Sequence, residues 1–253
     1  MTKTVKALVV PFLLLLLAEL AAHLSPTTSD ALSPPSAVVL ALVRAFGDGS
    51  LLVATGDTLI AALGGLFIGA AIGLLLGIFL GLVPLLGKAT YLSIEVLRPI
   101  PSVALLPIAM LVFGFGYRME IAIVAFSCLW PMLILTRAAF FGVEPRLLEV
   151  SRALGLNVLA RVWKIILPAS LPRIIVAFRL AAGIALVVAV TVEIAVNPLG
   201  LGYGILVAQQ ALRPDLMLAY LLWVGIVGYA FNGCLSYLQR HLGRAALPGT
   251  TLR

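Results

Sequence analysis

Few of the 253 residues carry side chains that could do chemistry, and those few are scattered. The two cysteines, Cys128 and Cys234, both lie in apolar stretches and form no CxxC pair, so we expect them to pack rather than react. The two histidines, His23 and His241, have no partners at metal-ligand spacing, and we predict no metal site. No Ser-His-Asp, Cys-His or paired-carboxylate arrangement stands out. These patterns predict that the chain is not an enzyme by itself.

The sequence also lacks a phosphate-binding glycine loop. Such a loop needs G-x-x-x-x-G-K-[ST], in which backbone N–H groups cradle the phosphates. The nearest approach has five residues between Gly81 and Gly87, and no hydroxyl residue follows Lys88. We therefore predict that this chain binds no cofactor, and in particular neither ATP nor Mg.

The composition places the exterior of the protein in a lipid bilayer. Hydrophobic residues make up 62% of the chain and charged residues only 11%, whereas soluble domains carry about 25% charged residues. The net charge of +7 could suggest nucleic acid. However, no basic run is interleaved with aromatic residues, and basic residues of membrane proteins collect in cytoplasmic loops. We predict an all-α, polytopic membrane protein that binds no nucleic acid.

Six stretches with few or no charges are candidate transmembrane helices, because a helix needs about 20 residues to cross the hydrocarbon core. They are residues 7–24, 58–87, 99–117, 121–136, 174–197 and 216–239. The first could be a cleaved signal peptide, since it has a basic start and a short apolar run. The missing A-x-A site and Glu19 favour a retained helix. We expect one transmembrane domain over 1–253, with the first helix and an outer segment over 1–51 and the transmembrane core over 52–242.

The distribution of basic residues predicts the orientation. With the N-terminus in the cytoplasm, only three of the 17 Lys and Arg residues fall outside, namely Arg44, Arg118 and Arg213. Cytoplasmic loops carry such an excess, so both termini are expected in the cytoplasm. In the outer segment, Ser36 is a candidate N-cap of a short helix along the membrane face, and an ordered loop is the alternative.

Charged residues near the spans have separate expected roles. Glu193 lies in the fifth span toward its outer end, and a carboxylate in lipid usually faces a cavity or a partner. It either lines the pathway or gate, or makes a structural hydrogen bond to a neighbouring helix. Glu95 and Arg98 are expected to pair on one helix face. Arg118 and Glu120 flank an outer turn and are expected to be solvated.

The second span carries a glycine at every fourth position, which places these residues near one helix face. They are Gly65, Gly69, Gly73, Gly77 and Gly81. Small residues at this spacing let helices approach closely in lipid. We predict a close contact with another helix, in the same subunit or in another.

The longest cytoplasmic loop, residues 138–172, is also the most basic. Its apolar residues have the spacing of two short amphipathic helices, with a break at Gly155, because glycine tolerates the left-handed conformation at a helix end. Pro168 and Pro172 are expected to break the helix in a turn at the membrane surface. The apolar stripe must be covered by the chain's own helices, by a partner or by lipid headgroups.

This loop resembles the EAA loop of ATP-binding-cassette (ABC) importer permeases. That pattern reads E-A-A, three residues, G, nine residues, I, one residue, L-P, and every spacing is matched. The matching residues are Glu149, Gly155, Ile165, Leu167 and Pro168. Val150 and Ser151 replace the two alanines. Stretches at 97–101, 104–107, 113–116 and 197–202 resemble the nitrate, taurine and aliphatic-sulfonate permease group.

The resemblance implies the type I importer permease (MetI-like) fold and a bacterial inner-membrane location. It implies that the chain forms the pathway for a small solute, such as a sulfonate, taurine or nitrate. Expected partners are a second permease copy, two ATPase subunits that hold ATP and Mg, and a solute-binding protein. Contact with the ATPase would involve Glu149, Val150, Ser151, Arg152, Ala153, Leu154 and Gly155, with Ile165, Leu167 and Pro168 continuing the loop. A stand-alone secondary transporter or channel is the alternative.

Overall fold

The computed structural model describes residues 9–10, 13, 16–22 and 33–246, and the described part is α-helical without strands. Of the predicted first span, residues 7–24, the structure describes residues 9–10, 13 and 16–22, which are helical, and the others lie outside the described residues. The main elements are α2 (Pro35–Gly47), α3 (Ser50–Leu82), α4 (Pro84–Ala89), α5 (Tyr91–Leu97), η1 (Ser102–Leu105), α6 (Leu106–Phe113), α7 (Tyr117–Phe141), α8 (Pro145–Ala153), α9 (Val158–Arg161), η2 (Val162–Ile166), α10 (Leu167–Ala195), α11 (Gly200–Gln210) and α12 (Pro214–Ala246).

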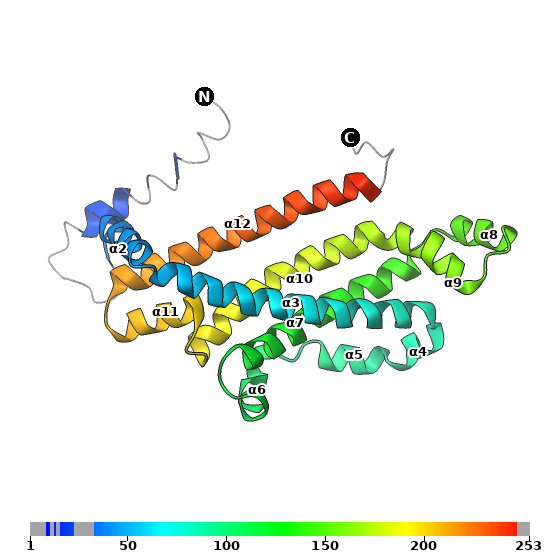
Figure 1. Cartoon of the computed structure of the whole chain (residues 1–253), viewed down its shortest axis with the longest axis horizontal. Helices are drawn as coiled ribbons and strands as arrows, with labels where there is room; N and C mark the ends of the chain where they lie inside the picture. The colour runs from blue at the N-terminus through cyan, green and yellow to red at the C-terminus, as the bar shows by residue number, and fades with distance from the viewer. Residues whose placement is uncertain (1–8, 11–12, 14–15, 23–32, 247–253) are drawn as a thin grey trace.

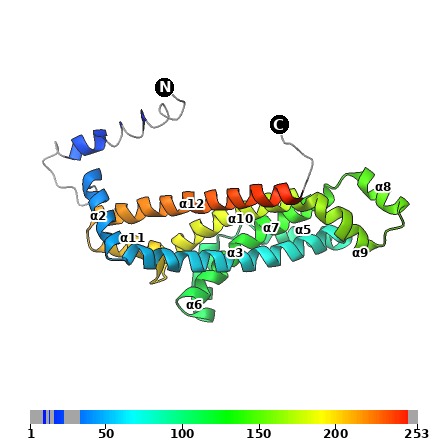
Figure 2. The ribbon, with the colours of Figure 1, turned by 45° about the horizontal axis from the view of Figure 1, so that its top comes forward.

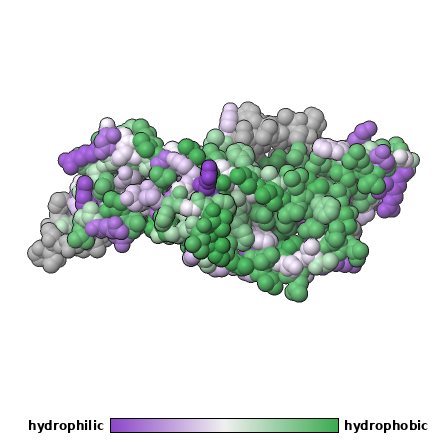
Figure 3. Space-filling view, turned by 60° about the horizontal axis from the view of Figure 1, so that its bottom comes forward, coloured by the Kyte–Doolittle hydropathy of each residue, from purple (hydrophilic) through white to green (hydrophobic). Residues whose placement is uncertain are grey.

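The long helices α3, α7, α10 and α12 run along the long axis of the molecule (Figure 1). In the described part, four helical stretches are long and apolar enough to cross a membrane: Ser50–Leu82, Tyr117–Phe141, Val158–Gln210 and Pro214–Tyr237. On the face shown in Figure 3, hydrophobic atoms cover the middle of the molecule and hydrophilic atoms gather mainly toward its two ends. This distribution suits a body whose middle faces lipid.

The third predicted span, residues 99–117, is not one straight helix. The chain turns by 85° between Tyr91–Leu97 and Ser102–Phe113. Pro99 and Pro101 explain the break, because proline has no N–H to donate and disfavours a helical conformation of the preceding residue. Helix α6 therefore projects from the side of the bundle in both ribbon views (Figures 1 and 2).

The expected turn at Pro168 and Pro172 is also wrong. Pro168 is the second residue of α10 and directly follows a π-helical turn, and Pro172 lies inside the same helix. A π-helical turn over Val162–Ile166 joins α9 to α10 without a break. The helix that re-enters the membrane therefore begins in the loop itself.

Helix α2 occupies the outer segment, but Ser36 is not its N-cap. The helix begins at Pro35 with Pro34 as the N-cap residue. Its capping oxygens come from Glu19, which accepts hydrogen bonds from the Ser36 backbone N–H at 3.0 Å and from its hydroxyl at 2.6 Å. A carboxylate at a helix N-terminus satisfies free N–H groups and complements the helix dipole. After α2, the Ser50 N–H donates to Asp48, which lowers the pKa of that carboxyl.

The glycine stripe of α3 lies against α7. A Cβ added to Gly73 would lie 2.5 Å from the Leu129 carbonyl oxygen, and one added to Gly81 would lie 2.8 Å from the Phe140 Cβ. Gly65, Gly69 and Gly77 meet α7 in the same way. The backbones of α3 and α7 therefore touch over much of their length.

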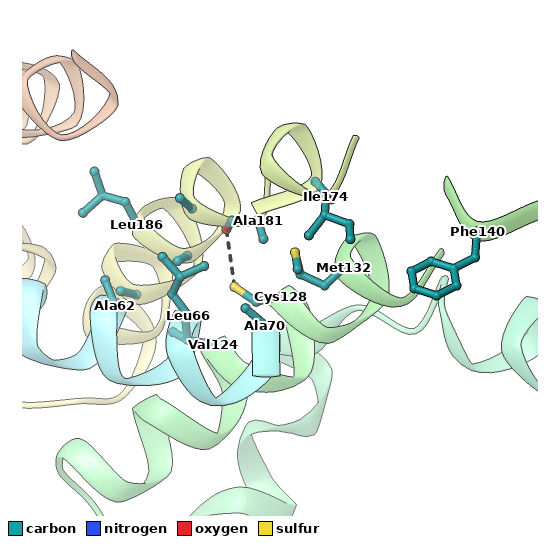
Figure 4. Packing of buried hydrophobic residues seen from close by; sticks show 14 of the residues in the cluster. Ala62, Leu66, Ala70, Val124, Cys128, Met132, Phe140, Ile174, Ala181 and Leu186 are labelled. Atoms are coloured by element: carbon teal, nitrogen blue, oxygen red, sulfur yellow. Dashed lines mark hydrogen bonds between the residues drawn. The ribbon is translucent and has the colours of Figure 1, made fainter. Parts of the chain in front are cut away.

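Helix α10 completes the core against α3 and α7. Its contact face is built mostly from alanine, including Ala177, Ala181, Ala185 and Ala189, which are all fully buried. Cys128 of α7 is buried in this cluster, and its thiol donates to the Ala181 carbonyl oxygen at 3.4 Å (Figure 4). Cys234 of α12 is exposed in the isolated chain. Small side chains on all three helices thus set the spacing of the core.

We predict that Gly73→Ala destabilises the protein by about 1–3 kcal/mol, the usual range for overpacking, because the new methyl group meets a backbone oxygen that cannot rotate away. Gly56→Ala, on the same helix, has nothing within 4 Å of the added Cβ and serves as the control. Thermal unfolding of the purified chain in detergent measures both. Equal melting temperatures for the two variants would contradict the close α3–α7 contact.

Candidate functional site

The loop between α7 and α10 forms a small rigid unit at one end of the molecule (Figure 1). Helix α8 ends in a Schellman motif: the Gly155 N–H donates to the Arg152 carbonyl at 2.9 Å, and the Leu156 N–H donates to the Ser151 carbonyl at 3.1 Å. Gly155 has φ +64°, which confirms the predicted helix stop. Asn157 then begins α9 and accepts a hydrogen bond from the Ala160 N–H at 2.8 Å. The two predicted short helices are therefore present.

The base of the loop is fixed to the membrane core by one face of α8. Ser151 is the buried residue of this helix, and its hydroxyl donates to the Leu148 carbonyl at 2.6 Å. Leu148 packs against the main hydrophobic cluster, as does Leu167 at the start of α10. Ser151 stands where the family pattern has an alanine, and the structure shows why a small residue fits there.

Polar contacts at the membrane boundary also hold the loop. Ser170 donates to the Ala139 carbonyl at 3.3 Å, which ties the start of α10 to the end of α7. Arg137 donates to the Gly87 carbonyl at 2.8 Å and lies 5.7 Å from the centre of the Phe141 ring. Helices α8 and α9 project from the bundle, and these contacts hold the chain at the point where the loop leaves it.

The outer side of the loop is apolar and uncovered within the described chain. Its exposed residues are Val150, Leu154, Val158, Leu159 and Trp163. Exposed fractions of 67% for Leu154 and 70% for Val158 are high for aliphatic side chains at a fixed position. Apolar surface of this kind marks a site of contact with a protein or a membrane.

The other residues of the predicted contact segment are exposed on α8. Glu149, Arg152 and Ala153 are exposed, and Glu149 makes no hydrogen bond or ion pair within the described residues. In the loop continuation, Ile165 is half-buried and Pro168 is exposed. The segment thus offers charged and apolar side chains to a partner from one short rigid helix.

A second polar site lies at the opposite end of α10. Glu193 is fully buried, and one of its oxygens, Oε2, accepts a hydrogen bond from the Gly202 N–H at 2.7 Å. The carboxyl of Glu120 lies beside it. Asn197 is fully buried, donates to Glu120 Oε2 at 2.6 Å and accepts from the Gly116 N–H at 3.0 Å. The cluster joins α7, α10, α11 and the turn before α7.

The expected solvation of Glu120 is wrong, because only 1% of this residue is exposed. Helix α7 begins at Tyr117, so Glu120 lies one turn inside and faces α10. Its neighbour Arg118 is exposed, as expected. The predicted Glu95–Arg98 pair is confirmed at 3.4 Å. The prediction failed because α7 begins at Tyr117, four residues before the uncharged run at 121–136 from which the span was predicted.

Comparison with known protein families identifies one match. Residues 69–247 match the family model described as the binding-protein-dependent transport system inner membrane component. This range contains the loop, the cluster of Glu120, Glu193 and Asn197, and four of the five stripe glycines. The match covers well over half of the chain.

Two curated relatives each match more than half of the chain. A putative ABC transporter permease of Methanocaldococcus jannaschii is 34% identical over 147 residues, which are 58% of this chain and 55% of that protein. A putative aliphatic sulfonates transport permease, SsuC of Bacillus subtilis, is 33% identical over 150 residues, which are 59% and 54% of the two chains. The chain therefore spans about half the length of the curated relatives it matches.

The fold also matches a solved structure. A chain of the inward-facing MetNI methionine ABC transporter superposes with a TM-score of 0.66 at 21% sequence identity, over 83% of this chain and 99% of that one. At this identity the match establishes the fold alone. It confirms the predicted MetI-like architecture.

At the loop base, we predict that Ser151→Leu lowers stability by about 1–3 kcal/mol, since the buried site has no room for the larger side chain. Ser151→Ala keeps the volume and loses only a local hydrogen bond, worth about 1 kcal/mol. Ala153→Leu adds the same bulk at an exposed position of α8 and is the control. Protease susceptibility of the loop and thermal unfolding report the effect. If Ser151→Leu behaves like Ala153→Leu, α8 does not pack as described.

Proposed function

Because the chain belongs to the family of binding-protein-dependent transport system inner membrane components, we propose that it forms the solute pathway of an ABC importer and receives the ATP-driven motion through α8. Proteins of this family are non-catalytic, multi-pass membrane subunits, and an ATPase and a binding protein are their partners. The observation that carries the proposal is the exposed apolar surface of the loop beside Glu149, which makes no hydrogen bond or ion pair within the described residues.

The loop geometry suits the transmission of force. A short helix that is closed by a Schellman motif and packs against the π-turn at the start of α10 would pass a displacement on to α10. Its apolar side chains would fill a cleft on the ATPase, and Glu149 and Arg152 would set the register of docking. ATP and Mg would be held by that partner. Two permease copies, as a homodimer, and two ATPase copies complete the proposed assembly.

The orientation follows from the same contact. Since an ATPase is cytoplasmic, the α8–α9 end faces the cytoplasm, in agreement with its high content of basic residues. Both termini would then lie in the cytoplasm of a bacterial inner membrane. The α2 and α11 end would face outward, toward the solute-binding protein.

The proposed substrate is a small anion. The SsuC relative is a putative permease for aliphatic sulfonates, and this likeness supports a solute of the sulfonate, taurine or nitrate type. Selection among these anions would fall to the binding protein.

Docking of α8 on the ATPase subunit is tested with two variants of the predicted contact segment. Glu149→Ala and Gly155→Pro are expected to reduce binding-protein-stimulated ATPase activity and solute uptake at least about tenfold, an effect of about 1.4 kcal/mol on coupling. The measurement uses the chain co-purified with its ATPase subunit and reconstituted in lipid. Glu144→Ala removes an exposed carboxylate at the start of the same helix and is the matched control.

Each variant must insert into the membrane in the same amount as the wild type. Should no ATPase subunit co-purify, and uptake survive both changes, the loop would not be a docking element. A stand-alone secondary transporter or channel would then explain the fold better.

A further inference from the structure

The two carboxyl groups of this cluster, those of Glu120 and Glu193, lie beside each other in the core. Glu120 enters from α7 and Glu193 from α10, and their exposed fractions are 1% and 0%. Their side chains are within hydrogen-bonding reach of one another. The ion pairs of the described residues, Arg98–Glu95 and Arg213–Asp215, involve neither group. Two ionised carboxylates in this contact would repel each other strongly, because the surroundings have a low dielectric constant.

One oxygen of each carboxyl group lacks a hydrogen-bond donor. Glu120 Oε2 accepts from Asn197, and Glu193 Oε2 accepts from the Gly202 N–H. The other oxygen of each group, Oε1, is buried and has no donor. Buried oxygens rarely stay without a partner, because the lost hydration costs about 1–3 kcal/mol for each. One proton placed on either carboxyl supplies the missing donor and removes the repulsion at the same time.

We propose that Glu120 and Glu193 form a proton-binding site, in which one proton is shared between the two carboxyls and holds the outer ends of α7 and α10 together. The site does not depend on the proposed transport function. Its ligand is a proton rather than a metal ion, because the two side chains and Asn197 offer too few free oxygens for a metal cage.

Neighbouring elements add little that could replace the proton. Asp57 is the titratable group that faces the pair from α3, and it accepts a hydrogen bond from the Tyr117 hydroxyl of α7 at 2.5 Å. The Thr58 hydroxyl is within hydrogen-bonding reach of Glu193, but its one proton is donated to the Ala54 carbonyl at 3.1 Å, and its oxygen accepts from the Leu201 N–H at 2.9 Å. The turn before α7 and the start of α11 contribute the N–H groups of Gly116 and Gly202.

The pair is also linked to the local backbone. Asn197 bridges Glu120 to the turn before α7, and Gly200, with φ +85°, brings the backbone close against the Glu193 carboxyl. A side chain at Gly200 would collide with that carboxyl. Loss of the proton would therefore separate α7 from α10 and loosen the turn between α10 and α11.

The proposed proton makes the free energy of unfolding depend on pH. The folded protein holds one proton that two solvated glutamates release above about pH 4.3, the usual range of their pKa. Because the folded state binds more protons than the unfolded state, stability decreases as the pH rises.

The experiment combines infrared spectroscopy with thermal unfolding of the full chain purified in detergent, both across neutral and alkaline pH. The wild type is expected to show the carbonyl stretch of a protonated carboxylic acid at neutral pH, and its melting temperature should fall as that band disappears. Glu193→Gln and Glu120→Gln each supply an amide donor in place of the proton. Each should fold, lose the band and lose the pH dependence of the melting temperature.

Glu95→Gln is the matched control, since it removes an exposed carboxylate at the other end of the molecule. It should keep the band and the pH dependence. The proposal is overturned if the wild type lacks the band at neutral pH, or if the band survives both Gln substitutions. It is also overturned if exchanging potassium for sodium at constant pH raises the wild-type melting temperature and Glu193→Gln abolishes that rise, because the occupant would then be a sodium ion.

Discussion

The close contact between α3 and α7 is the constraint on which the rest of the structure depends. Lipid supplies no hydrophobic drive for helix association, so close packing must do that work. The glycines of α3 bring its backbone against α7, and the alanines of α10 fill the remaining side. With three helices held at short range, side chains at both ends of the bundle can be placed accurately. The loop at one end and the carboxyl cluster at the other are both supported by this core.

Much of this arrangement could be predicted from particular residues. The four-residue glycine repeat indicated a helix contact, and the sequence left open only whether the partner was in the same chain. The position of Gly155 indicated a helix stop, because glycine alone adopts positive φ without strain. The spacing from Glu149 to Pro168 indicated the permease family, and the family match agrees. These features are local, so they can be recognised in one stretch of sequence.

Other features could not be predicted because they depend on distant neighbours or on local backbone balance. Glu120 is buried against Glu193 and Asn197, which lie more than 70 residues away in sequence. Pro172 was expected to break a helix, yet the surrounding residues carry the helix through it. The uncharged run at 99–117 suggested a straight span, whereas prolines at its start bend the chain by 85°. Charge counts alone do not distinguish a straight helix from a bent pair.

The unbroken junction of α9, the π-turn and α10 has a mechanical consequence. Helix α10 has 29 residues, so it extends for about 44 Å at 1.5 Å per residue. The loop is attached at one end of this rod and Glu193 lies near the other. If α10 tilted as one body about its alanine-lined contact with α3 and α7, a displacement at the loop end would move the Glu193 end in the opposite sense. Such a motion would need no relay of side-chain rearrangements between the two ends.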